Sequence, residues 1–107
     1  MSIHEVSVDE LEGILGGGAR LIDVREHVEY LDAHVPGAVL VPLGMIADRV
    51  DQFRGEGPAY IICRSGARSM RAAEFLAEQG IDAVNVAGGT SAWIISGRPV
   101  VAGDQPS

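Results

Sequence analysis

The chain has 107 residues, a formal net charge of −7 and one cysteine, and each of its eight basic residues is arginine. This length is sufficient for one domain with one hydrophobic core. The acidic balance argues against a nucleic-acid partner, because phosphate binding needs a basic face. No apolar run approaches the length of a membrane span, and a single cysteine cannot form an internal disulfide. We therefore expect a cytoplasmic protein with neither nucleic acid nor membrane as a partner.

Hydrophobic periodicity predicts strands that alternate with helices along the chain. After the first strand, Ser7 and Glu10 have the spacing of a capping box, and the helix they start is expected to end at three consecutive glycines. Pro36 and Gly37 predict a turn before the third strand. The predicted strands span residues 3–6, 19–24, 39–41, 60–62 and 83–86. Helices are predicted at residues 7–15, 26–33, 45–53 and 69–79, with a short one around 93–95.

This alternation indicates an α/β fold with a parallel sheet, helices on both faces and right-handed crossovers. We expect one domain over residues 1–102 and a loose C-terminal tail over residues 103–107. Sites of parallel α/β proteins lie at the carboxyl ends of the strands. The loop after the strand at 60–62 is therefore the expected site.

Cys63 lies in this loop, before the helix that is predicted to begin at Ser69, and it is accompanied by Arg64 and Arg68. A loop from a strand to a helix N-terminus presents backbone N–H groups and partial positive charge, and it therefore favours an anion. Held there beside two guanidinium groups, the thiol is expected to have a pKa below the free value of about 8.5 and to react as thiolate. Free cysteines are also among the most buried residues, so a structural role is the alternative. The two arginines favour chemistry, because a buried structural thiol gains nothing from nearby cations.

Other polar residues carry weaker signals. Asp23 and Arg25 end the second strand, at the edge where α/β sites form, but a structural ion pair that fixes the loop is the favoured interpretation. His34 is the histidine near a strand terminus that would have to pair with Cys63 in a protease-like site, and its turn context favours a structural role. The three histidines lack the spacing of a zinc site, so we expect no metal and no other cofactor.

Four segments, in this order, resemble the single-domain rhodaneses, a family of thiosulfate sulfurtransferases. They are L-I-D-V-R-E at 21–26, H-V-P-G-A at 34–38, C-R-S-G-A-R-S at 63–69 and G-G-T-S-A-W-I-I-S-G-R-P-V at 88–100. The resemblance extends from about residue 7 to residue 100, nearly the whole chain. It implies a rhodanese-like fold with a five-stranded parallel sheet of order 1-5-4-2-3, flanked by helices on both faces.

The resemblance also implies a reaction. Cys63 would attack the outer sulfur of thiosulfate, release sulfite and keep a persulfide, which cyanide, a small thiol or a redox protein would then discharge. Arg64 would bind the anionic substrate, and the loop amides would hold the persulfide. Besides Cys63, the implied site comprises Arg64, Ser65, Gly66, Ala67, Arg68 and Ser69, with Asp23 and Arg25 in support.

Two alternatives to a sulfurtransferase remain open. Rhodanese-like phosphatases and arsenate reductases have five residues between cysteine and arginine, whereas four residues separate Cys63 from Arg68, and the smaller ring suits sulfur. A sulfur-carrier or regulatory module is the other alternative, although catalytically inactive relatives usually lack the cysteine that this chain keeps. The physiological donor and acceptor are not specified by the sequence.

Overall fold

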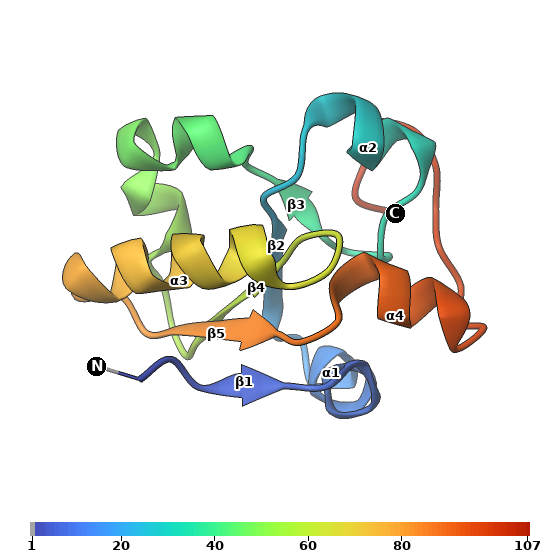
Figure 1. Cartoon of the computed structure of the whole chain (residues 1–107), viewed down its shortest axis with the longest axis horizontal. Helices are drawn as coiled ribbons and strands as arrows, with labels where there is room; N and C mark the ends of the chain where they lie inside the picture. The colour runs from blue at the N-terminus through green and yellow to red at the C-terminus, as the bar shows by residue number, and fades with distance from the viewer. Residues whose placement is uncertain (1) are drawn as a thin grey trace.

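Five short apolar segments form one parallel sheet in the computed structural model, which describes residues 2–107 (Figure 1). The strands are β1 (Glu5–Val6), β2 (Arg20–Asp23), β3 (Val39–Leu40), β4 (Ala59–Ile62) and β5 (Ala83–Val86). Their order is β1-β5-β4-β2-β3, and every pairing is parallel. The predicted α/β class and strand order are therefore confirmed. Ile22 of β2 pairs with Val39 of β3 on one side and with Ile61 of β4 on the other. The strand that precedes Cys63, β4, is the central strand of the sheet.

Helices cover both faces of this sheet, as the alternating pattern predicted. They are α1 (Val8–Gly16), α2 (His27–Asp32), α3 (Ala67–Glu78) and α4 (Gly89–Ile95), with two 3₁₀ helices, η1 (Leu43–Asp48) and η2 (Val50–Phe53). One apolar cluster packs α3, η1 and η2 against the sheet, and a second cluster packs α1, α2 and α4 against the other face. Each face therefore has its own core, and the carboxyl ends of the strands remain free to hold the loops of a site.

Local sequence signals explain the ends of several elements. Ser7 Oγ accepts a hydrogen bond from the Glu10 amide at 3.1 Å, and Glu10 Oε1 accepts one from the Ser7 amide at 3.0 Å, which confirms the capping box. The single helix predicted over residues 45–53 was wrong, because this segment forms η1 and η2 with a break at Arg49. Apolar spacing that buries Ile46 and Phe53 is satisfied by 3₁₀ turns as well as by an α-helix, so the pattern could not distinguish them.

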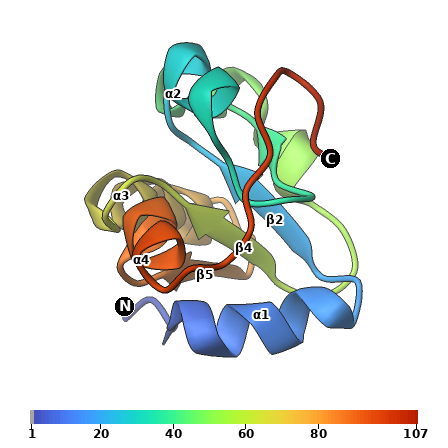
Figure 2. The same cartoon turned by 90° about the vertical axis from the view of Figure 1, so that its right-hand side faces the viewer.

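The C-terminal segment is bound to the domain, which corrects the prediction of a loose tail. The Gly103 amide donates to the Leu31 carbonyl at 2.9 Å, and the Gly37 amide donates to the Pro106 carbonyl at 2.8 Å. Figure 2 shows this segment running from α4 toward α2. Backbone donors of the turn around Gly37 need acceptors once they are removed from water, and the terminal carbonyls supply them.

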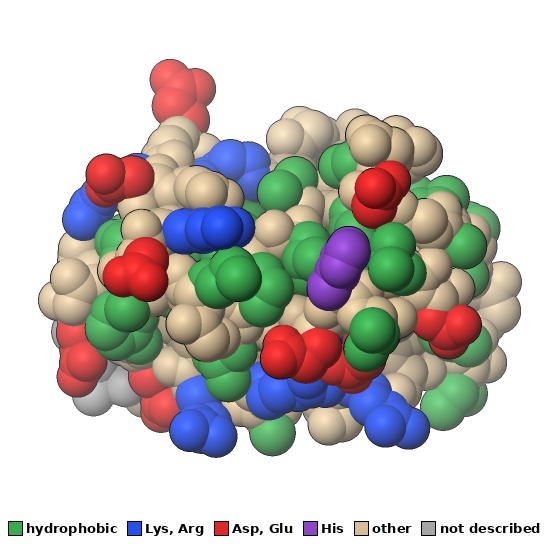
Figure 3. Space-filling model, turned by 90° about the horizontal axis from the view of Figure 1, so that it is seen from above, with side chains coloured by type: hydrophobic (Ala, Val, Ile, Leu, Met, Phe, Trp, Pro, Cys, Tyr) green, Lys and Arg blue, Asp and Glu red, His purple; other side chains and the backbone are tan. Residues whose placement is uncertain are grey.

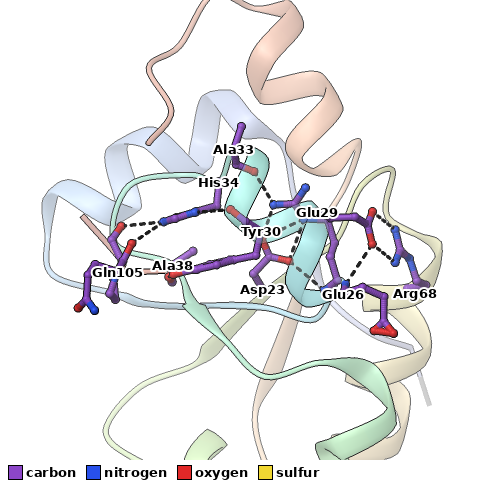
Figure 4. A network of polar contacts seen from close by, with 11 residues as sticks. Asp23, Glu26, Glu29, Tyr30, Ala33, His34, Ala38, Arg68 and Gln105 are labelled. Atoms are coloured by element: carbon purple, nitrogen blue, oxygen red, sulfur yellow. Dashed lines mark hydrogen bonds and ion pairs between the residues drawn. The ribbon is translucent and has the colours of Figure 1, made fainter. Parts of the chain in front are cut away.

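His34 is buried under this segment. One ring nitrogen lies 2.8 Å from the Tyr30 carbonyl oxygen and the other lies 2.8 Å from the Gln105 carbonyl oxygen (Figure 4). Its ring stacks on that of Tyr30 with centroids 3.6 Å apart, and the Tyr30 hydroxyl donates to the Ala38 carbonyl. His34 therefore contacts α2 and the C-terminal segment, in agreement with the structural role that its turn predicted.

On the face shown in Figure 3, acidic and arginine side chains are interspersed. Within residues 2–107, no helix combines the length and the apolar character that a membrane span requires.

Candidate functional site

Cys63 lies directly after β4 at the carboxyl edge of the sheet, with a side chain that is only 1% exposed. Its Sγ accepts a hydrogen bond from the Gly66 amide at 3.1 Å and another from Ser69 Oγ at 3.2 Å. Gly66 has φ +109°, a conformation that favours glycine, and it is the N-cap of α3. The sulfur therefore sits in a ring of donors at a helix N-terminus, as the loop predicted.

These donors control the acidity of the thiol. Burial by itself raises the pKa of Cys63, but hydrogen bonds from the Ser69 hydroxyl and from the Ser69, Gly66 and Ser65 amides outweigh it. The pKa of Cys63 consequently lies below that of an ordinary thiol, which favours thiolate. The direction agrees with the sequence analysis, and the loop amides that it invoked are among the donors, whereas it did not identify the Ser69 hydroxyl.

The ring is also held from the β5 side. Gly66 presents its carbonyl oxygen to Asn85 Nδ2 at 3.3 Å and to Ser69 Oγ at 3.2 Å, and Asn85 Nδ2 also donates to Glu5 Oε2 at 2.7 Å. Asn85 is buried in β5, so its amide group connects β1 and β5 to the cysteine loop. Sequence analysis did not identify Asn85, since a polar residue within a short apolar strand gives no indication of its partner.

The turn between β5 and α4 supports the loop at closer range. The Thr90 amide donates to the Cys63 carbonyl at 2.8 Å, and the Ser91 amide donates to the Arg64 carbonyl at 2.9 Å. A Cβ on Gly89 would lie 2.3 Å from the Cys63 carbonyl oxygen, so this position requires glycine for close backbone approach. The G-G-T-S run that begins the motif at residues 88–100 is the feature of the sequence that corresponds to this support.

The two loop arginines have different surroundings. Arg68 forms a two-pronged ion pair with Glu29 of α2, with nitrogen–oxygen distances of 2.8 and 2.9 Å (Figure 4). The hydrogen bond from Arg68 lowers the pKa of Glu29 to about 2, and the same bond raises the pKa of Arg68. Arg64 is exposed, and its guanidinium group has no hydrogen-bond or ion-pair partner among residues 2–107. Arg68 therefore ties the loop to α2, whereas Arg64 has a free guanidinium group.

Asp23 and Arg25 form the structural ion pair that the sequence favoured. Arg25 Nη2 lies 2.8 Å from Asp23 Oδ2 and donates to the Ala33 carbonyl at 2.7 Å, and both side chains are buried. Asp23 Oδ1 also accepts the Arg25 amide at 3.0 Å. The pair thus closes the loop between β2 and α2 beside the site. In the described part of the chain, no three His, Cys, Asp or Glu side chains gather in a way that could hold a metal ion.

Comparison with known proteins adds family relationships to this geometry. The Rhodanese-like domain family matches residues 7–96. A sulfurtransferase of Allochromatium vinosum is 37% identical over 83 residues, which cover 77% of this chain and 78% of that protein. A thiosulfate sulfurtransferase of Actinobacillus pleuropneumoniae is 36% identical over 84 residues, which cover 78% of this chain and 78% of that protein.

A solved structure extends the similarity to three dimensions. The rhodanese-like domain protein from Staphylococcus aureus is 36% identical and gives a TM-score of 0.80, covering 85% of this chain and 91% of that chain. The matched segment contains the cysteine loop and the strands that position it. The chain therefore belongs to the rhodanese-like family.

Proposed function

We propose that the protein is a sulfurtransferase in which Cys63 carries sulfur, as a persulfide, from thiosulfate to a thiol or to cyanide. The observation that carries this proposal is the ring of donors around Cys63 Sγ, which stabilises a thiolate at the carboxyl edge of the sheet. The relatives named as sulfurtransferases support the class of reaction.

In the first step, the Cys63 thiolate attacks the outer sulfur of thiosulfate. A bond forms between Sγ and that sulfur, the sulfur–sulfur bond of thiosulfate breaks, and its electron pair leaves with sulfite. An acceptor nucleophile then attacks the outer sulfur of the persulfide, and the electron pair of the broken bond returns to Cys63 as thiolate. The Gly66 amide and the Ser69 hydroxyl stabilise this recurring negative charge without having to reorganise.

The loop arginines take separate roles in this scheme. Arg64 follows the nucleophile directly and has a free guanidinium group, which suits the sulfonate end of thiosulfate. Arg68 is already paired with Glu29, so its role is to position the loop rather than to bind substrate.

Mass spectrometry of the protein after incubation with thiosulfate tests the proposal directly. We expect the wild-type protein to gain the mass of one sulfur atom and to lose it when cyanide is added, with formation of thiocyanate. We expect neither change in Cys63→Ser. Thiocyanate formation by Cys63→Ser at the unmodified rate would refute the role of the cysteine. Loading by a persulfide donor but not by thiosulfate would instead indicate a sulfur carrier.

The phosphatase alternative is tested in the same samples. Phosphoryl transfer requires donors for several oxygens around the attacked phosphorus, and the loop from Cys63 to Arg68 is one residue shorter than the phosphatase pattern. We expect aryl phosphate hydrolysis to be far slower than sulfur transfer under matched conditions. Comparable rates would favour the phosphatase.

A further inference from the structure

A cavity of about 400 Å³ opens beside the cysteine loop, between α2 and α4. Its lining includes Arg25, Glu29 and Asp32, together with Arg64 of the cysteine loop and Ser91 of α4. Its volume falls in the range of small-molecule sites. Two of its lining residues lie close to Cys63 along the chain and through a hydrogen bond. Arg64 directly follows Cys63, and the Ser91 amide donates to the Arg64 carbonyl.

Two guanidinium groups of this cavity have unused donors. The side chain of Arg25 is only 7% exposed, and its Nε and Nη2 bond Asp23 and the Ala33 carbonyl. Its Nη1 has no hydrogen-bond partner in the described chain, although Arg25 lines the cavity. Arg64, as described above, has none either. A carboxylate placed between them would satisfy donors that the protein leaves free.

The same cavity also contains an unpaired negative charge. Glu29 is committed to Arg68, but the exposed carboxylate of Asp32, the last residue of α2, has no ion-pair partner within residues 2–107. A simple anion would satisfy the arginines but would leave the charge of Asp32 without a partner. A ligand with both a carboxylate and an ammonium group complements the whole set of charges.

We propose that this cavity is the acceptor subsite of the sulfurtransferase and that it selects thiols with an amino-acid head group. The inference rests on the proposed function and names its acceptor. The carboxylate of the acceptor binds Arg64 and Arg25 Nη1, and its ammonium group binds Asp32. Its thiolate attacks the outer sulfur of the Cys63 persulfide, a sulfur–sulfur bond forms, the bond to Sγ breaks, and the electron pair returns to Cys63. The product is the persulfide of the acceptor.

A comparison of three thiols tests the selectivity. The protein is loaded with thiosulfate and freed of donor, and the discharge rate per concentration of thiolate is measured with cysteine, with cysteamine, which lacks the carboxylate, and with N-acetylcysteine, which lacks the ammonium group. We expect cysteine to react about fivefold faster than either analogue, the size of one exposed charge pair. Equal rates for the three thiols would overturn the proposal.

Variants test which residue binds the ammonium group. Asp32→Asn should lower the rate with cysteine to that with N-acetylcysteine and leave discharge by cyanide unchanged. Asp48→Asn changes another exposed aspartate, in η1, which does not line the cavity, and it should leave all rates unchanged. Loss of the preference for cysteine in Asp48→Asn as well as in Asp32→Asn would overturn the assignment to this cavity.

A binding measurement separates this inference from the proposed function. S-methylcysteine has the head group but no thiol, and its titration into the unloaded protein can be followed through the backbone amide signals of Asp32 and Ser91. We expect both signals to shift at millimolar ligand, and the shifts to disappear in Asp32→Asn. Shifts without any persulfide formation would support the head-group site and refute the sulfur chemistry. No shifts, with normal persulfide formation, would refute the subsite alone.

Discussion

Removal of the Ser69 hydroxyl should make the Cys63 thiol less acidic. Ser69 Oγ is buried and lies 3.2 Å from Sγ, but it also lies 3.2 Å from the Gly66 carbonyl oxygen, so two acceptors share one proton. A hydrogen bond to a charged group contributes about 1.5–3 kcal/mol, and this sharing favours the lower end. At pH values below the thiol pKa, Ser69→Ala should therefore lower the thiolate fraction about tenfold, since ~1.4 kcal/mol is a factor of ten.

The rate of alkylation by iodoacetamide, measured against pH, follows the thiolate fraction directly. Ser65→Ala is a matched control, because Ser65 is exposed and acts on the sulfur through its backbone amide, which alanine retains. We expect the alkylation profile of Ser69→Ala to move to higher pH. The profile of Ser65→Ala should coincide with that of the wild-type protein. Coincident profiles for Ser69→Ala and the unmodified protein would refute the hydroxyl as the dominant donor.

Four further outcomes follow from the site. Arg64→Ala should raise the KM for thiosulfate about tenfold with little change in kcat, and steady-state kinetics with an unchanged KM would place donor binding elsewhere. Arg68→Ala leaves Glu29 without its partner, so it should cost about 1–3 kcal/mol in urea unfolding and lower kcat as well. Because the folded-state pKa of Glu29 is about 2, below its ordinary 4.5, the pair contributes stability above the ordinary value and loses it as pH falls toward 2. Glu29→Gln should therefore flatten the fall in stability between about pH 5 and about pH 2, and an unaltered fall would mean that other groups cause it. Gly89→Ala places a Cβ against the Cys63 carbonyl, and a loss of less than about 1 kcal/mol in the same unfolding assay would mean that the backbone can move away.

Patterns confined to a few neighbouring residues were sufficient to predict much of this fold. The apolar run before Cys63 predicted a strand that ends at the carboxyl edge of the sheet, and Cys63 lies at that edge. Ser7 and Glu10 predicted the start of α1, because both partners of a capping box lie within one turn. The strand order followed only from the family resemblance, since periodicity does not specify which strands are neighbours.

Long-range pairings account for what the sequence could not predict. Arg68 follows Cys63 in the same loop, and this proximity suggested an action on sulfur, yet its partner Glu29 is 39 positions away. The tail was expected to be loose because it lies at the end of the chain. Its backbone carbonyls nevertheless bond to the His34 ring and accept a hydrogen bond from the Gly37 amide. Every residue has a backbone carbonyl, so the pattern of side chains does not indicate which carbonyls will be bound.

The contact between Cys63 Sγ and Gly66 has a consequence for folding. Gly66 has no side chain to cap α3, and the Cys63 sulfur instead accepts a hydrogen bond from the amide at the helix start. Since the folded state lowers the pKa of this thiol, it gains stability at pH values above the pKa of the unfolded thiol and loses it as pH falls through the folded value. Alkylation, oxidation or sulfur loading changes the charge on this cap. A thermal melting curve can therefore report what fraction of a preparation carries a modified Cys63.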